Sequence, residues 1–223
     1  LSMEELKECG AQGLITNSYI IYKNSELKNI AEEKGVHGLL NWDGPIMTDS
    51  GTFQSHVYGE IDMQPDEILN FQKKIGVDIG TVLDVFCEPE TRFEDAKKEL
   101  EETQRRIEES DKNKGSIFLA APIQGGRHLD LRLKAAEMAS QTNAEVFPIG
   151  GVVPLMEKNN FEKLVEVIIA SKKGLDMSRP VHLFGCGHPM LFALASFLGC
   201  DLFDSSSYAK FASRDSLMFT WGT

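Results

Sequence analysis

Three aspartates stand at the ends of short apolar runs, where their carboxylates could do chemistry. Asp49 follows "IMT", Asp84 follows "TVL" and Asp204 follows "LF". Two carboxylates about 5 Å apart suit retaining chemistry at a sugar C1, in which one attacks carbon and the other moves a proton. Taken singly, each aspartate is explained more simply as a cap on the helix or turn that follows it. Three of them in one chain, together with Gln124 and a glycine pair, weaken that simpler explanation, although spacing alone does not show that they meet.

A second group of residues suits a planar ligand with a polar edge. Gln124 lies in "IQGG", and a further glycine pair ends "PIGG" at residues 148–151. A glutamine side chain offers one acceptor and two donors, and glycine lets a flat group approach the backbone closely. Phe53 and Phe184 could stack on such a ligand. Turns for the glycines and core packing for the phenylalanines are the alternatives.

The stretch "HLFGCGH" raises the question of a metal site, because it contains His182, Cys186 and His188. Successive strand residues point to opposite sides and no fourth ligand is near, so we expect no metal site in this chain. The other cysteines are expected to be buried thiols without a special role: Cys9, Cys87 and Cys200.

Seven short apolar runs alternate with longer amphipathic segments. The runs are almost continuously apolar, which is typical of parallel strands buried on both faces. They cover residues 13–18, 45–51, 78–84, 116–126, 145–151, 180–187 and 200–206. Helices are predicted between them, at residues 65–76, 91–110, 127–140, 160–174 and 188–199.

This alternation predicts an α/β fold, either a doubly wound sheet or an eight-stranded barrel. Every apolar run ends in polar or glycine residues. In a TIM (β/α)8 barrel all strand C-termini open on the face where the active site is built, so the barrel is favoured. With seven strands counted, we expect one strand to lie outside the chain. Residues 1–223 are read as one domain.

Composition excludes some classes of protein. Hydrophobic residues make up 42% and charged residues 26% of the 223 residues, as in a soluble globular protein. No apolar run approaches the roughly 20 residues of a membrane span, and the N-terminus does not resemble a secretion signal. The four cysteines form no C-x-x-C pair, which favours a reducing cytoplasm. The net charge of −11 argues against a nucleic-acid partner for this chain alone.

Five stretches allow comparison with a known family: "TDSGTFQ", "IQGG", "PIGGVVPLME", "HLFGCGHPMLFALA" and "GCDLFDSSSYAKFA". Together and in this order they resemble the tRNA-guanine transglycosylases. "LITNSYIIYKNSEL" and "DSSSYAKFA" are similar to the archaeal branch, which makes the archaeosine precursor. The resemblance implies a TIM-type barrel and a pentosyltransferase that exchanges guanine at position 15 of the tRNA D-arm for 7-cyano-7-deazaguanine.

The resemblance also implies roles for individual residues. Asp204 matches the nucleophile that attacks C1′ of the ribose, and Asp49 matches the general acid/base. The groups that read the base edge correspond to Asp84, Gln124 and Gly151, with Val152 facing the 7-substituent. Phe53 and Phe184 match the pair that sandwiches the base. Ser50, beside Asp49, is expected to keep the turn tight within the substrate site.

The chain departs from the family pattern in several places. Nothing in it matches the family's first barrel strand, its three-Cys-one-His zinc module or the archaeal RNA-binding domains, and "VFCEPE" replaces a proline-rich run. We therefore expect a partial catalytic barrel, a fragment or one part of a split protein, that alone exchanges no guanine. In the complete protein the resemblance implies zinc, with ligands outside this chain, and a cytoplasmic homodimer.

Three other functions remain open. The chain could be a non-catalytic tRNA-binding subunit, although such a subunit needs none of Asp49, Asp84 and Asp204. It could belong to a paralogue that acts on 7-deazaguanine in DNA. An unrelated barrel glycosidase is disfavoured, because a sugar site requires neither Gln124 nor a stacking pair.

Overall fold

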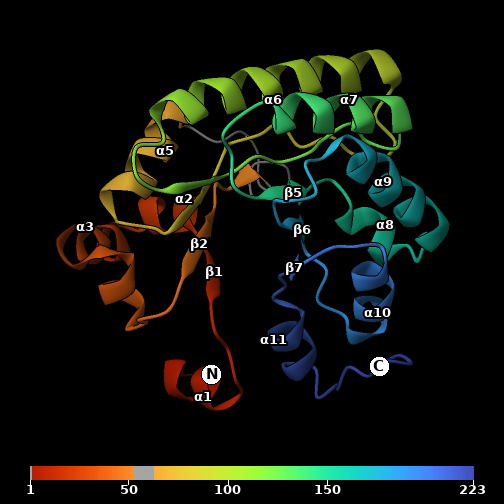
Figure 1. Ribbon diagram of the computed structural model, residues 1–223. Coiled ribbons are helices and arrows are strands. Elements are labelled where there is room, and N and C mark those ends of the chain that lie inside the picture. Colours follow the sequence, from red (N-terminus) through yellow and green to blue (C-terminus); the bar gives the residue numbers. More distant parts are fainter. Residues whose placement is uncertain (1, 53–62) are drawn as a thin grey trace. The chain divides into compact units, whose positions relative to one another are not determined.

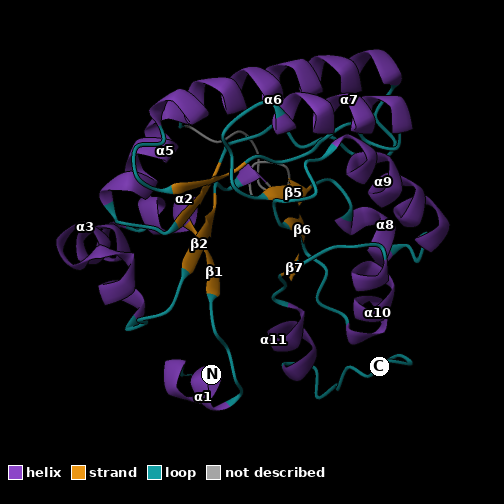
Figure 2. Ribbon diagram, viewed as in Figure 1, coloured by secondary structure: helices purple, strands orange, loops and turns teal. Residues whose placement is uncertain are grey.

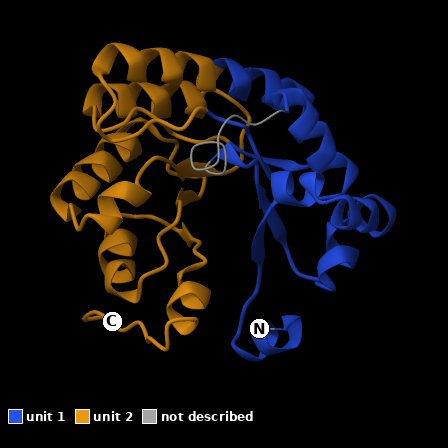
Figure 3. Ribbon diagram, turned by 180° about the vertical axis from the view of Figure 1, so that it is seen from behind, with its two compact units in different colours: residues 1–84, 105–120 blue, residues 85–104, 121–223 orange. Residues whose placement is uncertain are grey.

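The computed structural model describes residues 2–52 and 63–223. They fall into two compact units, and each is described by itself. Unit 1 comprises residues 1–84 and 105–120, and unit 2 comprises residues 85–104 and 121–223 (Figure 3). Phe53, the predicted stacking residue, lies outside the described residues.

Unit 1 is built on a four-stranded parallel sheet (Figure 1). The strand order is β1-β2-β3-β4, so neighbours in sequence are neighbours in the sheet. The register pairs Asn17 with Asp49 at the C-terminal ends of the first two strands. The strands are β1 (Leu14–Asn17), β2 (Ile46–Asp49), β3 (Ile79–Thr81) and β4 (Phe118–Ala120).

The helices of unit 1 begin at recognisable caps. The side chain of Asn17 caps α2 and that of Asn24 caps α3. Pro65 occupies the first turn of α5, which ends with two lysines near the negative end of the helix dipole. The bounds are α1 (Met3–Glu8), α2 (Ser18–Lys23), α3 (Ser25–Leu40) and α5 (Pro65–Lys74). The division between the units falls within α6 (Phe93–Asn113).

Unit 2 contains a three-stranded parallel sheet in the order β5-β6-β7. A parallel bridge between Ile123 and Ile149 continues the pairing on the β5 side. The strands are β5 (Phe147–Ile149), β6 (Val181–Leu183) and β7 (Leu202–Phe203). The helices are α7 (Leu129–Ser140), α8 (Val153–Glu157), α9 (Phe161–Gly174), α10 (Pro189–Phe197) and α11 (Ser207–Ala212).

The α/β class with parallel strands is confirmed, and strands alternate with helices along the chain (Figure 2). Each of the seven predicted strands is present, although shorter than its apolar run. The five predicted helices are also present, as α5, α6, α7, α9 and α10. The prediction missed α1, α2, α3, α8 and α11. Four of these have only five or six residues, and α3 is interrupted at Gly35, which has φ 74°.

The sheets place large apolar side chains in the cores of both units. In unit 1 Ile46 and Leu119 are completely buried, and in unit 2 Phe147, Ile149 and Leu183 are. Burying each such side chain contributes roughly 1.5–3 kcal/mol. Among the described helices, none has the length and apolar character needed to cross a bilayer.

Candidate functional site

Asp49 ends β2 with both carboxylate oxygens engaged. Asn17 Nδ2 donates to Asp49 Oδ2 at 3.0 Å across the register pair, and the Gly51 amide donates to Oδ1 at 3.3 Å. Ser18 Oγ also donates to the backbone oxygen of Asp49, at 2.8 Å. The carboxylate is half-buried and anchored from a neighbouring strand, in addition to the turn bond that the cap interpretation predicts.

The turn after Asp49 is bound to the segment that follows β3. Ser50 Oγ donates to the backbone oxygen of Val82 at 3.2 Å, and Thr52 Oγ1 donates to that of Asp84 at 3.3 Å. Gly51 has φ 99°, and a Cβ there would lie 2.4 Å from Tyr19 Cβ, so the turn requires glycine. The Ser50 hydroxyl thus serves the turn, as predicted, and its role in substrate binding stays a prediction.

Asp84 lies three residues beyond β3 and is 7% exposed. Arg106 Nη1 donates to the backbone oxygen of Leu83 at 3.0 Å and approaches that of Asp84 at 3.5 Å. Unit 1 therefore brings the segments of Asp49 and Asp84 together through adjacent strands and the Ser50–Thr52 turn. Asp49 and Asp84 therefore stand at or just beyond the C-terminal ends of two paired parallel strands.

Gln124 and the glycines after β5 form the corresponding part of unit 2. Gln124 is 2% exposed, and its Oε1 accepts from the Cys87 amide at 3.3 Å. A Cβ on Gly150 would lie 2.5 Å from Gln124 Nε2, and one on Gly151 would lie 2.9 Å from Oε1. Gly151 also has φ 66°. The glycine pair therefore leaves the space that the glutamine amide occupies, while Val152 beside it is fully buried.

No sequence pattern indicated the role of Arg132 on α7. This arginine is completely buried, and its burial lowers the pKa of the guanidinium to about 10. Its Nε donates to the Gly126 oxygen at 2.8 Å, and its Nη1 donates to the oxygens of Ile123 and Gly150 at 2.7 and 2.8 Å. It thereby binds both glycine segments that flank Gln124.

Asp204 follows β7, and a single oxygen of its carboxylate receives two hydrogen bonds. Oδ1 lies 2.9 Å from His182 Nε2 and 2.9 Å from the Gly185 nitrogen. Oδ2 accepts no hydrogen bond within the described part of the chain. Asp204 does not cap α11, whose N-cap is Ser206, so the cap alternative is wrong for this aspartate. The carboxylate is instead held by one oxygen, which leaves the other for a ligand.

His182 is a second residue that the sequence prediction missed. It lies on β6, is 3% exposed, and its ring meets that of Phe184 edge-on at 4.7 Å. A buried histidine beside a carboxylate must carry a proton on Nε2, since two acceptors would repel each other. The available signal was a histidine inside an apolar strand, next to the strand that leads to Asp204. The motif "HLFGCGH" indicated only a possible metal ligand at this position.

The described residues do not contain a cluster of three or more His, Cys, Asp or Glu that fits a metal ion. His188 Nδ1 instead accepts from the Met190 amide at the start of α10. Cys186 is buried, and burial raises the pKa of its thiol to about 12.

The remaining thiols follow the prediction with one exception. Cys87 and Cys200 are buried, and burial raises their pKa values to about 12 and about 11. Cys9 is exposed, so its predicted burial is wrong. It is the C-cap of the short helix α1, none of whose residues is buried.

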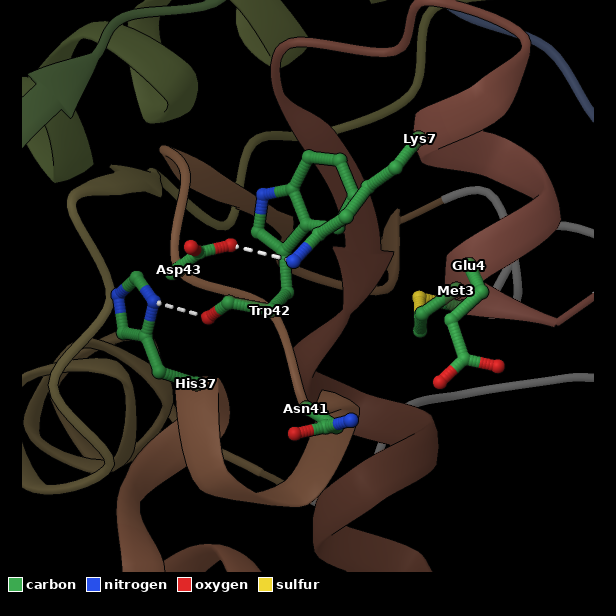
Figure 4. Close-up of a pocket in the computed structure, with 7 residues that line it drawn as sticks. All are labelled: Met3, Glu4, Lys7, His37, Asn41, Trp42 and Asp43. Carbon is green, nitrogen blue, oxygen red and sulfur yellow. Dashed lines mark hydrogen bonds and ion pairs between the residues drawn. The ribbon is translucent and has the colours of Figure 1, made fainter.

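A hollow of about 320 Å³ in unit 1 is distinct from these groups (Figure 4). Lys7 Nζ pairs with Asp43 at 2.6 Å beside the Trp42 ring, and His37 Nδ1 lies 3.0 Å from the Trp42 oxygen. None of the residues that line it is a predicted site residue. The lining consists of Met3, Glu4, Lys7, His37, Asn41, Trp42 and Asp43.

Comparison with known proteins connects this geometry to a family. Residues 1–223 match the family described as queuine tRNA-ribosyltransferase. A tRNA-guanine(15) transglycosylase of Methanosarcina acetivorans is 54% identical over 95% of this chain and 44% of its own length. Proteins of the same name from Thermoplasma acidophilum and Methanosarcina mazei are each 51% identical over the whole chain.

The chain spans 35% and 46% of those last two relatives, so it is less than half as long as the proteins it matches. The match nevertheless covers every strand and every candidate residue described above. The chain belongs to the queuine tRNA-ribosyltransferase family.

Proposed function

We propose that this chain is the catalytic part of a tRNA-guanine(15) transglycosylase that replaces guanine by 7-cyano-7-deazaguanine on the way to archaeosine. The name of the relatives supports the reaction and the position. The archaeal character of "LITNSYIIYKNSEL" and "DSSSYAKFA" supports the identity of the incoming base.

The reaction requires a nucleophile and a proton donor. Asp204 Oδ2 attacks C1′ of the ribose, and the bond from C1′ to guanine N9 breaks. Guanine takes that electron pair together with a proton from Asp49. The incoming base then gives a proton to Asp49 and attacks C1′ through N9, which restores the Asp204 carboxylate. Atoms and charge balance without any further reactant.

One observation carries this assignment. Two donors, His182 Nε2 and the Gly185 amide, hold Asp204 Oδ1 from β6 and the turn after it. A carboxylate fixed in this way presents Oδ2 in one direction, which is the preorganisation that nucleophilic attack needs. A subunit that only binds tRNA has no use for this arrangement.

The polar groups predicted to read the base are chemically suited to the edge of guanine. A carboxylate such as Asp84 can accept from N1–H and the 2-amino group, and the amide of Gln124 and the N–H of Gly151 can donate to O6. Such a site rejects bases that lack these groups, because its buried polar atoms would be left unpaired. A base in folded tRNA must also leave its stack to react, at a cost of a few kcal/mol.

The test uses the full-length protein and its tRNA, with 9-deazaguanine supplied to occupy the base site. We expect wild type to form a denaturation-resistant adduct and Asp204→Asn to form none. Asp201→Asn is the matched control, because the Asp201 carboxylate accepts from the Val181 amide, at 2.8 Å, and Asp201 precedes Asp204 on the same segment. An Asp204→Asn variant that traps tRNA as wild type does would refute the assignment.

A further inference from the structure

Arg132 has an unusual set of partners for a buried charge. In the described part of the chain it pairs with no carboxylate, and its three hydrogen bonds go to the backbone oxygens of Ile123, Gly126 and Gly150. Its Nη2 has no partner there. Burying an unpaired charge costs several kcal/mol, which carbonyl bonds offset only in part. The arginine supplies donors to three buried carbonyl oxygens, but it leaves its own charge and its Nη2 without a partner in the described part of the chain.

The bonded carbonyls belong to the peptide units that surround the predicted base-reading groups. The Gly150 oxygen and the Gly151 N–H lie in one rigid peptide plane. Holding the oxygen therefore fixes the direction of the N–H. The Ile123 oxygen fixes the peptide of Gln124 in the same way.

The Gly151 N–H itself makes no hydrogen bond to any described residue, although Gly151 is buried. Buried backbone N–H groups are almost always paired, so this donor beside the glutamine amide is available to an acceptor atom of a ligand or of a bound water. Arg132 Nη2 lies nearby, 3.4 Å from the position that a Cβ on Gly151 would take. A positive charge on the carbonyl side also polarises the peptide and strengthens its N–H as a donor.

We propose that Arg132 is a positioning residue for base recognition, which aims and strengthens the Gly151 N–H toward the carbonyl oxygen of a guanine-type base. This inference rests on the proposed function and adds to it the source of selectivity for a base with an oxygen at position 6. Arg132 touches no substrate atom. It acts through the two glycine segments that it binds.

The test compares guanine with 2-aminopurine, which lacks the 6-oxygen, by titration calorimetry on the full-length protein. In wild type we expect guanine to bind more tightly. In Arg132→Met we expect guanine affinity to fall by about tenfold or more while 2-aminopurine affinity changes little, since only the first ligand uses the N–H. The ratio of the two affinities is the readout, because a general loosening of the fold would weaken both ligands alike.

Arg179→Met is the matched control. Arg179 lies in the same unit and also binds three backbone oxygens, those of Ser140, Thr142 and Ala144, away from the candidate residues. It should lower the melting temperature and leave the affinity ratio unchanged.

Arg132→Lys keeps the positive charge but cannot make all three hydrogen bonds, so its ratio of guanine to 2-aminopurine affinity should lie between those of wild type and Arg132→Met. If Arg132→Met does not fold, Arg132→Lys takes its place in the test. An unchanged ratio in the folded Arg132 variant would overturn this inference alone. A wild-type protein that binds neither base and traps no tRNA would instead refute the proposed function.

Discussion

Gly150→Ala isolates the contribution of the Gln124 amide. The new Cβ would lie 2.5 Å from Gln124 Nε2 and 3.2 Å from its Cδ. Ordinary van der Waals contact begins about 1 Å further out, so the amide must move by about that distance. The backbone at Gly150 does not have a positive φ, so alanine brings no conformational strain of its own. The change therefore acts on one side chain.

The expected loss follows from the hydrogen bonds of that amide. Displacing Gln124 removes a bond to the base and leaves a buried group unpaired, which costs about 1–3 kcal/mol. At 1.4 kcal/mol for each factor of ten, guanine affinity should fall by roughly 5- to 150-fold. The fold should lose less, because the hydrogen bond that the Cys87 amide donates to Gln124 Oε1 is long, at 3.3 Å.

The assay is calorimetric titration of guanine, with thermal unfolding measured on the same samples. Gly76→Ala is the control. Gly76 has φ 69°, and nothing lies within 4 Å of the position that a Cβ would take, so the substitution adds backbone strain without a steric contact. It should lower stability by about 1 kcal/mol and leave guanine affinity unchanged.

A double-mutant cycle with Gln124→Met completes the experiment. If Gly150→Ala acts through Gln124, the double variant should bind guanine no more weakly than Gln124→Met alone. Additive losses, or guanine affinity at the wild-type level in Gly150→Ala, would show that Gln124 does not contact the base.

Three further predictions concern the other candidate groups. Asp84→Ala should weaken guanine binding at least about tenfold with an unchanged circular dichroism spectrum, because a buried base donor loses its charged acceptor; unchanged affinity would remove Asp84 from the site. His182→Phe removes one of the two donors on the Asp204 carboxylate, a bond to a charged group that contributes about 1.5–3 kcal/mol, so guanine exchange should slow by about ten- to a hundredfold. His182→Gln, which keeps a donor, should be faster than His182→Phe in the same assay of labelled guanine incorporation. At pH 8 iodoacetamide should label Cys9 alone, since burial raises the pKa values of the other thiols to about 11 or 12. Mass spectrometry before and after unfolding gives the number of labelled cysteines.

The strands were predictable because their signal is local. Continuous apolar runs such as that around Ile46 and Phe147 are buried in parallel sheets whatever surrounds them. The short helices were not, because α2 and α3 depend on single asparagine caps rather than on a long apolar stripe. Gly35 also interrupts the periodicity of α3.

The candidate site divides in the same way. The sequence placed Asp49 and Gln124 at strand ends; Asp49 does end β2, whereas Gln124 follows the isolated bridge residue Ile123, beyond the end of β4 at Ala120. It gave no indication that His182 binds Asp204, which lies 22 residues away, or that Arg132 binds Gly150, which lies 18 residues away. Such partners depend on which strands become neighbours, and no spacing in the chain encodes that.

The two donors on Asp204 Oδ1 have a consequence for the lifetime of the covalent stage in the proposed reaction. When Oδ2 bonds to the ribose, Oδ1 becomes an ester carbonyl that still faces His182 Nε2 and the Gly185 amide. N–H donors bind a carboxylate more strongly than they bind an ester. They therefore stabilise the enzyme with a free Asp204 carboxylate relative to the enzyme that is covalently bound to the ribose. They make Asp204 a good leaving group as well as a well-aimed nucleophile. Exchange of one base for another requires that the ester bond between Asp204 and the ribose breaks as readily as it forms. The hydrogen bond from His182 on β6 to Asp204 would therefore set the lifetime of the covalent enzyme–tRNA intermediate.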